Sequence, residues 1–133
     1  MLKLQASLVL LFLTCAPAWA DDMKICMGEE KGDRVPTCTR LVNAATTPAE
    51  RSLLLAHRGV ALLPDDHVRA LADFNEGIKI NAKCADCYAG RGAYYLLVTK
   101  QVDLARRDIA QALMLDPDNG FAQHFETILK KLP

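Results

Sequence analysis

Four cysteines are the residues whose type and spacing in this chain could do chemistry. Cys84 and Cys87 form a Cys-x-x-Cys motif, and Cys26 and Cys38 lie twelve residues apart. The fifth cysteine, Cys15, belongs to an apolar N-terminal segment. Four cysteines allow three pairings, of which the local one, Cys26 with Cys38 and Cys84 with Cys87, is the simplest. An even number of cysteines favours disulfides if the chain is exported.

The Cys84-Ala-Asp-Cys87 motif has one structural and two chemical interpretations. It lies where a helix is expected to begin, and the free amides and dipole of a helix start favour a thiolate, as thiol–disulfide exchange requires. The same spacing suits a structural bridge, because residues i and i+3 of a helical turn have Cα atoms about 5 Å apart. Exchange enzymes place this motif after a strand in a βαβ unit, which this sequence does not predict. The structural disulfide is therefore favoured, with exchange as the alternative and metal binding after it.

The remaining residues capable of chemistry form no recognisable site. His57, His67 and His124 are scattered, and none pairs with a cysteine or a carboxylate at metal-ligand spacing. The chain holds no Gly-x-Ser-x-Gly, no glycine-rich phosphate loop and no His-Glu-x-x-His. Asp65 and Asp66 have the pattern of turn and helix-cap residues. The sequence therefore predicts no catalytic residue, no metal, no cofactor and no enzyme activity.

The first twenty residues match a secretory signal peptide. Lys3 supplies the positive charge, residues 6–13 are almost all apolar, and Ala18-Trp19-Ala20 gives a cleavage site of the small-x-small type. The apolar run is about half the length that spans a bilayer, so no stable membrane insertion is expected after cleavage. Removing these 20 residues from 133 leaves a mature chain of 113, beginning at Asp21. We expect it in the periplasm or secreted from the cell.

Composition limits the mature chain to one domain and makes two classes of partner unexpected. Hydrophobic residues make up 51% of the sequence, which is enough to bury a core. Sixteen lysines and arginines balance sixteen aspartates and glutamates, so no net charge attracts nucleic acid or an anionic membrane surface. Another protein or a peptide is therefore the expected partner.

Local signals mark where helices begin. Thr47-Pro48-Ala49-Glu50 combines a capping threonine, a first-turn proline and a glutamate three residues on, which together make a capping box. Pro64-Asp65-Asp66 ends one helix and caps the next. No Asn-Gly or Asp-Gly turn joins alternating strands, so a β fold is not expected.

Two stretches of the mature chain repeat one pattern of small and bulky residues. Matching positions lie 33 to 35 residues apart, so the mean period is near 34. The first set is Gly59, Ala70, Phe74, Gly77 and Ala82, and the second is Gly92, Ala105, Ile109, Ala112 and Pro117. Apolar residues follow helical spacing, and the small residues suit antiparallel helices that cross closely. The pattern therefore predicts two successive helical hairpins.

This pattern resembles the tetratricopeptide-repeat family over about residues 48–133. The pairs Arg58-Gly59 and Arg91-Gly92 resemble the bacterial form of the repeat. The resemblance implies an all-α fold in which helical hairpins stack as a short right-handed solenoid. Two positions depart from the family: Ala82 replaces a proline, and Lys100 stands where a glycine often ends the first helix of a unit.

The resemblance also implies the domain boundaries. A repeat domain of residues 47–133 contains units at about 50–82 and 84–117 and a C-terminal capping helix at 118–133. Residues 21–46 resemble a cysteine-bearing helical cap, in which a bridge between Cys26 and Cys38 would add about 2–3 kcal/mol. In the last helix the stripe expected to pack consists of Phe121, Phe125, Ile128 and Leu132.

The inner helices of such repeats line a concave groove that binds peptides or helices. The groove residues that the resemblance implies are Leu53, Ala56, His57, Val60 and Leu63 from the first unit and Asp86, Ala89, Ala93 and Leu96 from the second. This lining is mostly apolar, which favours an amphipathic helix or an extended apolar segment as ligand. His57 and Gly90 stand where members that clamp a carboxylate have asparagine, so clamping is not expected. In the alternative arrangement the C-terminal helix of the chain fills the groove.

Two functions remain open at this point. The first is a periplasmic protein-interaction module, an adaptor or assembly factor, that binds a peptide or helix in its groove. The second is a thiol–disulfide exchange protein that works through Cys84 and Cys87. With two full repeats the groove is small, so the sequence also allows a homo-oligomer.

Overall fold

The computed structural model describes residues 18–133, and over that range it contains seven α-helices and no strand. The helices are α1 (Ala18–Met27), α2 (Arg34–Ala44), α3 (Pro48–Leu62), α4 (His67–Ile80), α5 (Ala85–Leu97), α6 (Val102–Leu115) and α7 (Gly120–Leu129). The expected all-α class is confirmed for this part of the chain. The predicted signal peptide lies outside it except for residues 18–20. Within the described range, no helix has both the length and the apolar character that crossing a membrane requires.

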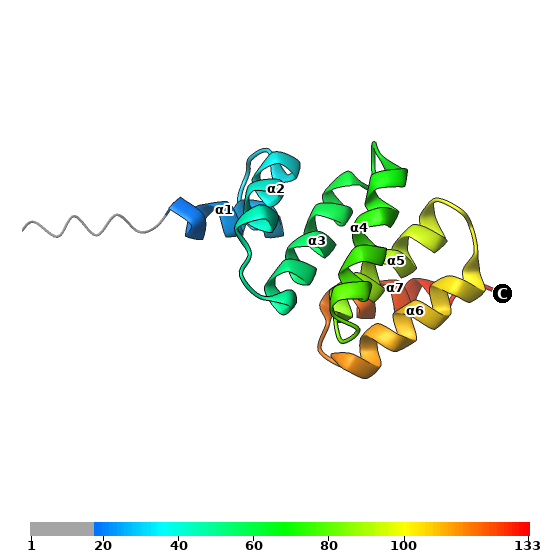
Figure 1. The fold of residues 1–133 in the computed structure, drawn as a ribbon. Coiled ribbons are helices and arrows are strands. Elements are labelled where there is room, and N and C mark those ends of the chain that lie inside the picture. Colours follow the sequence, from blue (N-terminus) through cyan, green and yellow to red (C-terminus); the bar gives the residue numbers. More distant parts are fainter. Residues whose placement is uncertain (1–17) are drawn as a thin grey trace, which may run out of the picture.

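The helices follow one another across the molecule as a row of hairpins (Figure 1). Helix α1 packs on α2, α3 on α4 and α5 on α6. Consecutive hairpins are joined because α2 contacts α3, α4 contacts α5, and α3 also contacts α5. The last helix, α7, packs against both α5 and α6. As a result, α3 lies between the N-terminal hairpin and α5.

The predicted helix starts are confirmed. The hydroxyl of Thr47 accepts the amide of Glu50 at 3.2 Å, and the Glu50 carboxylate accepts the amide of Thr46 at 3.0 Å. The Asp66 carboxylate accepts the amide of Arg69 at 3.0 Å and caps α4. Lys100, which stands where a glycine was expected, has a φ of 58°. The chain thus keeps the left-handed turn after α5 without glycine, at a conformational cost.

The repeated small residues make room for bulky core side chains. The ring of Phe74 on α4 is 0% exposed and lies between Gly59 of α3 and Gly90 of α5. A Cβ atom at position 59 would lie 2.6 Å from the ring, and one at position 90 would meet the same atom, Cε1. In the next hairpin, a Cβ atom at Gly92 would lie 2.9 Å from Ile109. Glycine is therefore required where the helices approach each other across these side chains.

Each of the hairpins α3–α4 and α5–α6 contains a bidentate ion pair between an arginine and an aspartate. The guanidinium of Arg58 on α3 donates to both carboxylate oxygens of Asp73 on α4, each at 2.8 Å. Arg91 on α5 does the same to Asp108 on α6, at 2.6 and 3.0 Å. Both arginines have a raised pKa, mainly because of these hydrogen bonds to the aspartate. The pairs join the two helices of a hairpin through largely buried charges.

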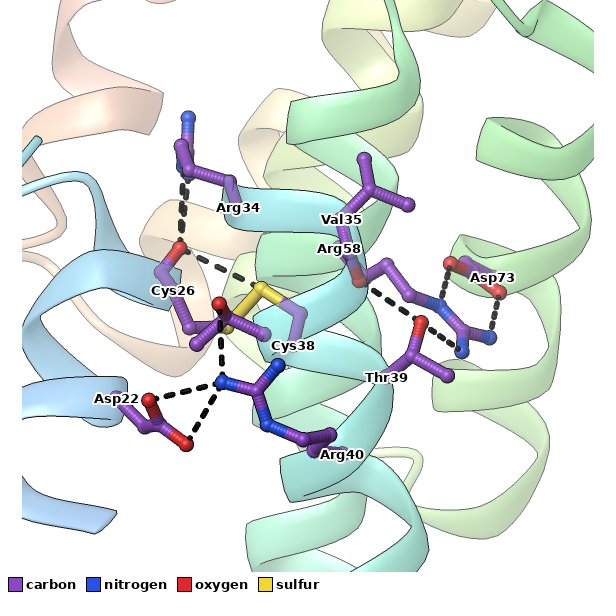
Figure 2. The surroundings of a disulfide bond; sticks show 10 residues. Asp22, Cys26, Arg34, Val35, Cys38, Thr39, Arg40, Arg58 and Asp73 are labelled. Atoms are coloured by element: carbon purple, nitrogen blue, oxygen red, sulfur yellow. Dashed lines mark hydrogen bonds and ion pairs between the residues drawn. A yellow bond between two sulfur atoms is a disulfide. The ribbon is translucent and has the colours of Figure 1, made fainter. Parts of the chain in front are cut away.

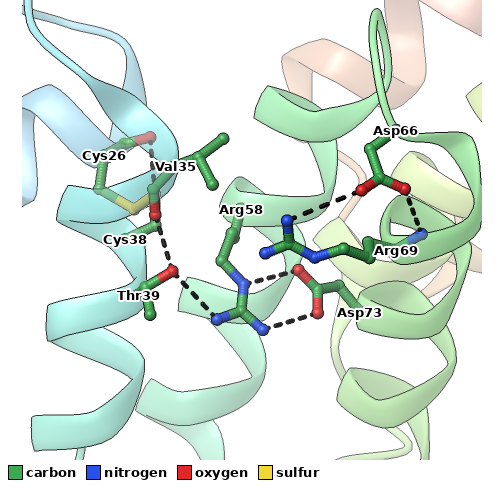
Figure 3. A network of polar contacts seen from close by, with 8 residues as sticks. All are labelled: Cys26, Val35, Cys38, Thr39, Arg58, Asp66, Arg69 and Asp73. Atoms are coloured by element: carbon green, nitrogen blue, oxygen red, sulfur yellow. Dashed lines mark hydrogen bonds and ion pairs between the residues drawn. A yellow bond between two sulfur atoms is a disulfide. The ribbon is translucent and has the colours of Figure 1, made fainter.

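The third guanidinium nitrogen of each arginine donates to a side chain of the preceding hairpin. Arg58 donates to the hydroxyl of Thr39 on α2 at 3.2 Å, and that hydroxyl donates to the carbonyl of Val35 at 2.8 Å (Figure 3). Arg91 donates in the same way to the side-chain oxygen of Asn75 on α4 at 2.9 Å. Helix α2 therefore occupies, relative to α3, the place that α4 occupies relative to α5. The N-terminal hairpin continues the same packing scheme.

The packed face of α7 differs from the predicted stripe. Its buried residues are Ala122, Phe125 and Leu129, whereas Phe121 is 36% exposed. Phe125 lies in the core, and Ile128 and Leu132 are partly buried against the same core cluster, as predicted. The prediction was wrong for Phe121 and missed Ala122 and Leu129, because the short helix carries apolar residues on two adjacent faces and packing against α5 and α6 selects between them.

Candidate functional site

A cavity of about 340 Å³ lies where the N-terminal hairpin, α3, α5 and the start of α7 meet. Its lining consists of Met27, Gly28, Arg34, Ala56, His57, Val60, Asp86 and Phe121. Apolar side chains from the N-terminal hairpin, α3 and α7 surround it, with one guanidinium, one imidazole and one carboxylate among them. A concave, mostly apolar surface with a few polar groups is the usual form of a binding site.

Four of the nine predicted groove residues line this cavity. Ala56, His57 and Val60 come from α3, and Asp86 comes from the first turn of α5. Leu63 lies elsewhere, at a second hollow formed by the turns that follow α3 and α5. Leu53 is half-buried and lines neither of these two surfaces. The groove predicted along α3 is therefore shorter than expected.

The groove residues predicted from the second unit need correction. Ala89 and Ala93 are fully buried, and Leu96 is nearly so. They pack in one core cluster with Phe125 and Leu129 of α7. The C-terminal helix of the chain thus fills this half of the groove, as the alternative arrangement had it. These three residues cannot contact a partner while α7 is docked.

The N-terminal hairpin contributes three lining residues that sequence reasoning missed. Arg34, the first residue of α2, donates through Nε and Nη2 to the carbonyl of Cys26, at 3.2 and 3.1 Å (Figure 2). Gly28 has a φ of 83°, and a Cβ atom there would lie 3.2 Å from the guanidinium carbon of Arg34. A signal existed in the sequence, because a basic residue in the first turn of a helix opposes the helix dipole. A basic residue at that position usually makes a specific contact that outweighs its unfavourable interaction with the dipole.

Both disulfides join cysteines that lie close in the sequence, which is the local pairing that the sequence favours as the simplest. Cys26 and Cys38 link α1 to α2 with a Cα separation of 5.0 Å, and Cys84 and Cys87 span the start of α5 with 5.3 Å. The sulfur of Cys84 also accepts the amide of Cys87 at 3.2 Å and so caps α5. Cys84 is 6% exposed and Cys87 is 0% exposed. An attacking thiolate could not reach these sulfurs without opening the core.

His57 is a titratable group of the cavity lining that is partly buried on α3. Burial lowers its pKa from the ordinary 6.5, and the positive charge of Arg34 acts in the same direction. The carboxylates of Asp86 and Glu29 raise this pKa, but they do not outweigh burial. The imidazole is therefore neutral at pH 7, and the only cationic side chain in the lining is Arg34.

This lowered pKa makes stability depend on pH in a defined direction. Below pH 6.5 the unfolded chain binds a proton that folded His57 resists, so folding loses stability until the pH passes the lower folded pKa. We expect His57→Gln to reduce the loss of unfolding free energy between about pH 7.5 and about pH 5. Urea unfolding at both pH values measures it. The exposed His67→Gln is the control, and an equal pH effect in both variants would contradict the burial argument.

Among residues 18–133, no group of three or more histidines, cysteines or carboxylates is placed to hold a metal ion. The polar groups of the cavity come from separate helices, and the rest of its lining is apolar. Comparisons of the chain with protein-family models, with curated proteins and with solved structures find no match.

Proposed function

We propose that this protein is an exported tetratricopeptide-repeat module that binds a segment of another protein in its α3 groove. The observation that carries the proposal is the cavity of about 340 Å³, which stays open while α7 fills the rest of the concave side. Its apolar floor and few polar groups suit the side chains of a helix or an extended peptide. The groove admits one or two anchor residues, so the affinity of the isolated module is modest.

The repeat assignment rests on equivalent contacts in successive hairpins. Gly59 and Gly92 face Phe74 and Ile109, the pairs that the period of about 34 had matched. The ion pairs Arg58–Asp73 and Arg91–Asp108 recur in the same way. Contacts that repeat between neighbours are what a stack of structural repeats requires. These equivalences support a short right-handed solenoid closed by α7.

The two disulfides support export to an oxidising compartment such as the periplasm. Disulfides persist outside the cytosol and are rare within it. Both bridges are buried; one joins α1 to α2, and the other closes the first turn of α5. Their burial argues against thiol–disulfide exchange as the main function, because exchange needs an accessible sulfur. We therefore do not carry exchange through Cys84 and Cys87 further.

Site-specific photocrosslinking in living cells tests the proposed groove. A photoreactive amino acid at Val60, which lines the cavity, should capture a recurrent partner protein. The matched control is the same amino acid at Val68, which is 81% exposed on α4 and outside the cavity. We expect the partner from position 60 and not from position 68. An added Phe121→Lys change, which places a charge in the cavity wall, should reduce the yield at position 60.

Two outcomes of the crosslinking experiment would contradict the proposal. Identical products from positions 60 and 68 would mean that the cavity is no particular binding site. Crosslinks only between copies of this chain would replace the proposed partner with self-association. A thermal melt of each variant confirms that the protein is folded before crosslinking.

A further inference from the structure

Two charged side chains of the cavity have no counter-ion among the described residues. Arg34 lines the cavity, and its hydrogen bonds go to the backbone carbonyl of Cys26 rather than to a carboxylate. Asp86 also lines the cavity and forms no ion pair with any lysine or arginine of residues 18–133. By contrast, the half-buried Arg58 and Arg91 are each paired with an aspartate. The two cavity charges therefore leave ion-pair positions inside the cavity that a ligand can occupy.

Both charges are held in place by neighbours. Two hydrogen bonds fix the guanidinium of Arg34 to Cys26, whose own position is tied to α2 by the bridge to Cys38 (Figure 2). One carboxylate oxygen of Asp86 accepts a hydrogen bond from the side-chain amide nitrogen of Asn119 at 2.9 Å, and Asn119 caps α7. Neither interaction neutralises the charge. Charged groups that are already ordered lose little entropy when they meet a ligand.

The charges lie on opposite sides of an apolar surface. Arg34 belongs to α2 and Asp86 to α5, and α3 packs between these helices. The part of the cavity that α3 provides consists of Ala56, Val60 and the neutral His57. A ligand that lies across α3 therefore meets a cation first, then apolar side chains, then an anion.

We propose that the groove selects a segment in which an apolar anchor residue stands between an acidic residue, which pairs with Arg34, and a basic residue, which pairs with Asp86. This inference rests on the proposed function and adds the charge pattern of the ligand. Complementary charges around an apolar centre set which partner binds and in which orientation. If both charged residues of the segment have the same sign, either Arg34 or Asp86 meets a like charge.

Synthetic helical peptides of about 15 residues provide the probe. The first has a leucine anchor with a glutamate one turn before it and a lysine one turn after it. Three others replace the glutamate, the lysine or both by glutamine. Fluorescence anisotropy measures the affinity of each peptide for the mature, oxidised protein. We expect each replacement to weaken binding about three- to fivefold, as partly exposed ion pairs do.

Protein variants show whether each charge of the peptide meets the proposed residue. In Arg34→Gln the peptide glutamate should lose its effect while the lysine keeps its own, and Asp86→Asn should do the reverse. Arg40→Gln and Asp65→Asn change the net charge equally, and neither residue lines the cavity. These controls should leave all peptide affinities unchanged. A purely structural role of Arg34 or Asp86 would weaken the four peptides alike, and that result contradicts the proposal.

The peptides also separate this inference from the proposed function. Equal binding of all four to the unchanged protein, blocked by Phe121→Lys, keeps the groove as a binding site and overturns the charge selection. Binding of none of them contradicts both.

Discussion

Replacing Phe74 by alanine is expected to lower the free energy of unfolding by about 3–5 kcal/mol. The ring is 0% exposed and fills the space between Gly59 of α3 and Gly90 of α5. Neither glycine has a side chain that could move into the cavity left behind, so the site cannot collapse. The ring also lies between two hairpins, so its loss weakens the contact that joins them. The expected change is a large fraction of the 5–15 kcal/mol that stabilises an ordinary domain.

Urea unfolding followed by circular dichroism measures the effect of Phe74→Ala. The matched control is Phe121→Ala, which removes the same ring from a side chain that is 36% exposed. We expect this control to cost about 1–2 kcal/mol, because the ring of Phe121 is only partly buried and its removal leaves no enclosed cavity. A Phe74→Ala protein as stable as the control would mean that α3, α4 and α5 are not packed around this ring.

Replacing Asp73 by alanine should cost about 2–4 kcal/mol of unfolding free energy. The change leaves the guanidinium of Arg58 without its carboxylate at a position where its side chain is 17% exposed. Arg58 cannot relieve the loss by deprotonating, since arginine stays charged in proteins. The same reasoning applies to Asp108 and Arg91 in the following hairpin.

The effect of Asp73→Ala can be separated from ordinary loss of a surface contact. The control is Glu126→Ala, which breaks an exposed pair with Lys130 and should cost below about 1 kcal/mol. The double change Arg58→Met with Asp73→Leu should recover much of the loss, because no buried charge is left unpaired. If Asp73→Ala costs no more than Glu126→Ala in urea unfolding, the buried pair does not hold the hairpin together.

Features that depend on neighbouring residues could be predicted from the sequence. The cap at Thr47 and the cap at Asp66 follow from local chemistry, and each is present. The close packing at Gly59 and Gly92 followed from the period, because the same small residue returned after 33 positions. These predictions needed no knowledge of how distant helices meet.

Features that depend on tertiary packing could not be predicted in the same way. Asp73 and Asp108 lie 15 and 17 residues from their arginines, and nothing local distinguishes them from exposed aspartates. The cavity includes Arg34 because the N-terminal hairpin packs against α3, which the repeat pattern does not describe. The burial of Ala89 and Ala93 follows from the docking of α7. The contacts of Arg34 and of α7 therefore lie outside the repeat, whereas Asp73 and Asp108 recur with the period but carry no local sign that they are buried.

The local pairing of the disulfides has a consequence for how the chain oxidises. The bridges close segments of 12 and 3 residues, whereas any other pairing among these four cysteines spans at least the 46 residues from Cys38 to Cys84. Short segments close faster and at a lower entropy cost than long ones. A chain that enters an oxidising compartment N-terminus first brings Cys38 to Cys26 before Cys84 arrives, and Cys87 then follows Cys84 at once. If the chain is exported as proposed, the order of its cysteines favours correct oxidation during delivery, without reshuffling of earlier bonds.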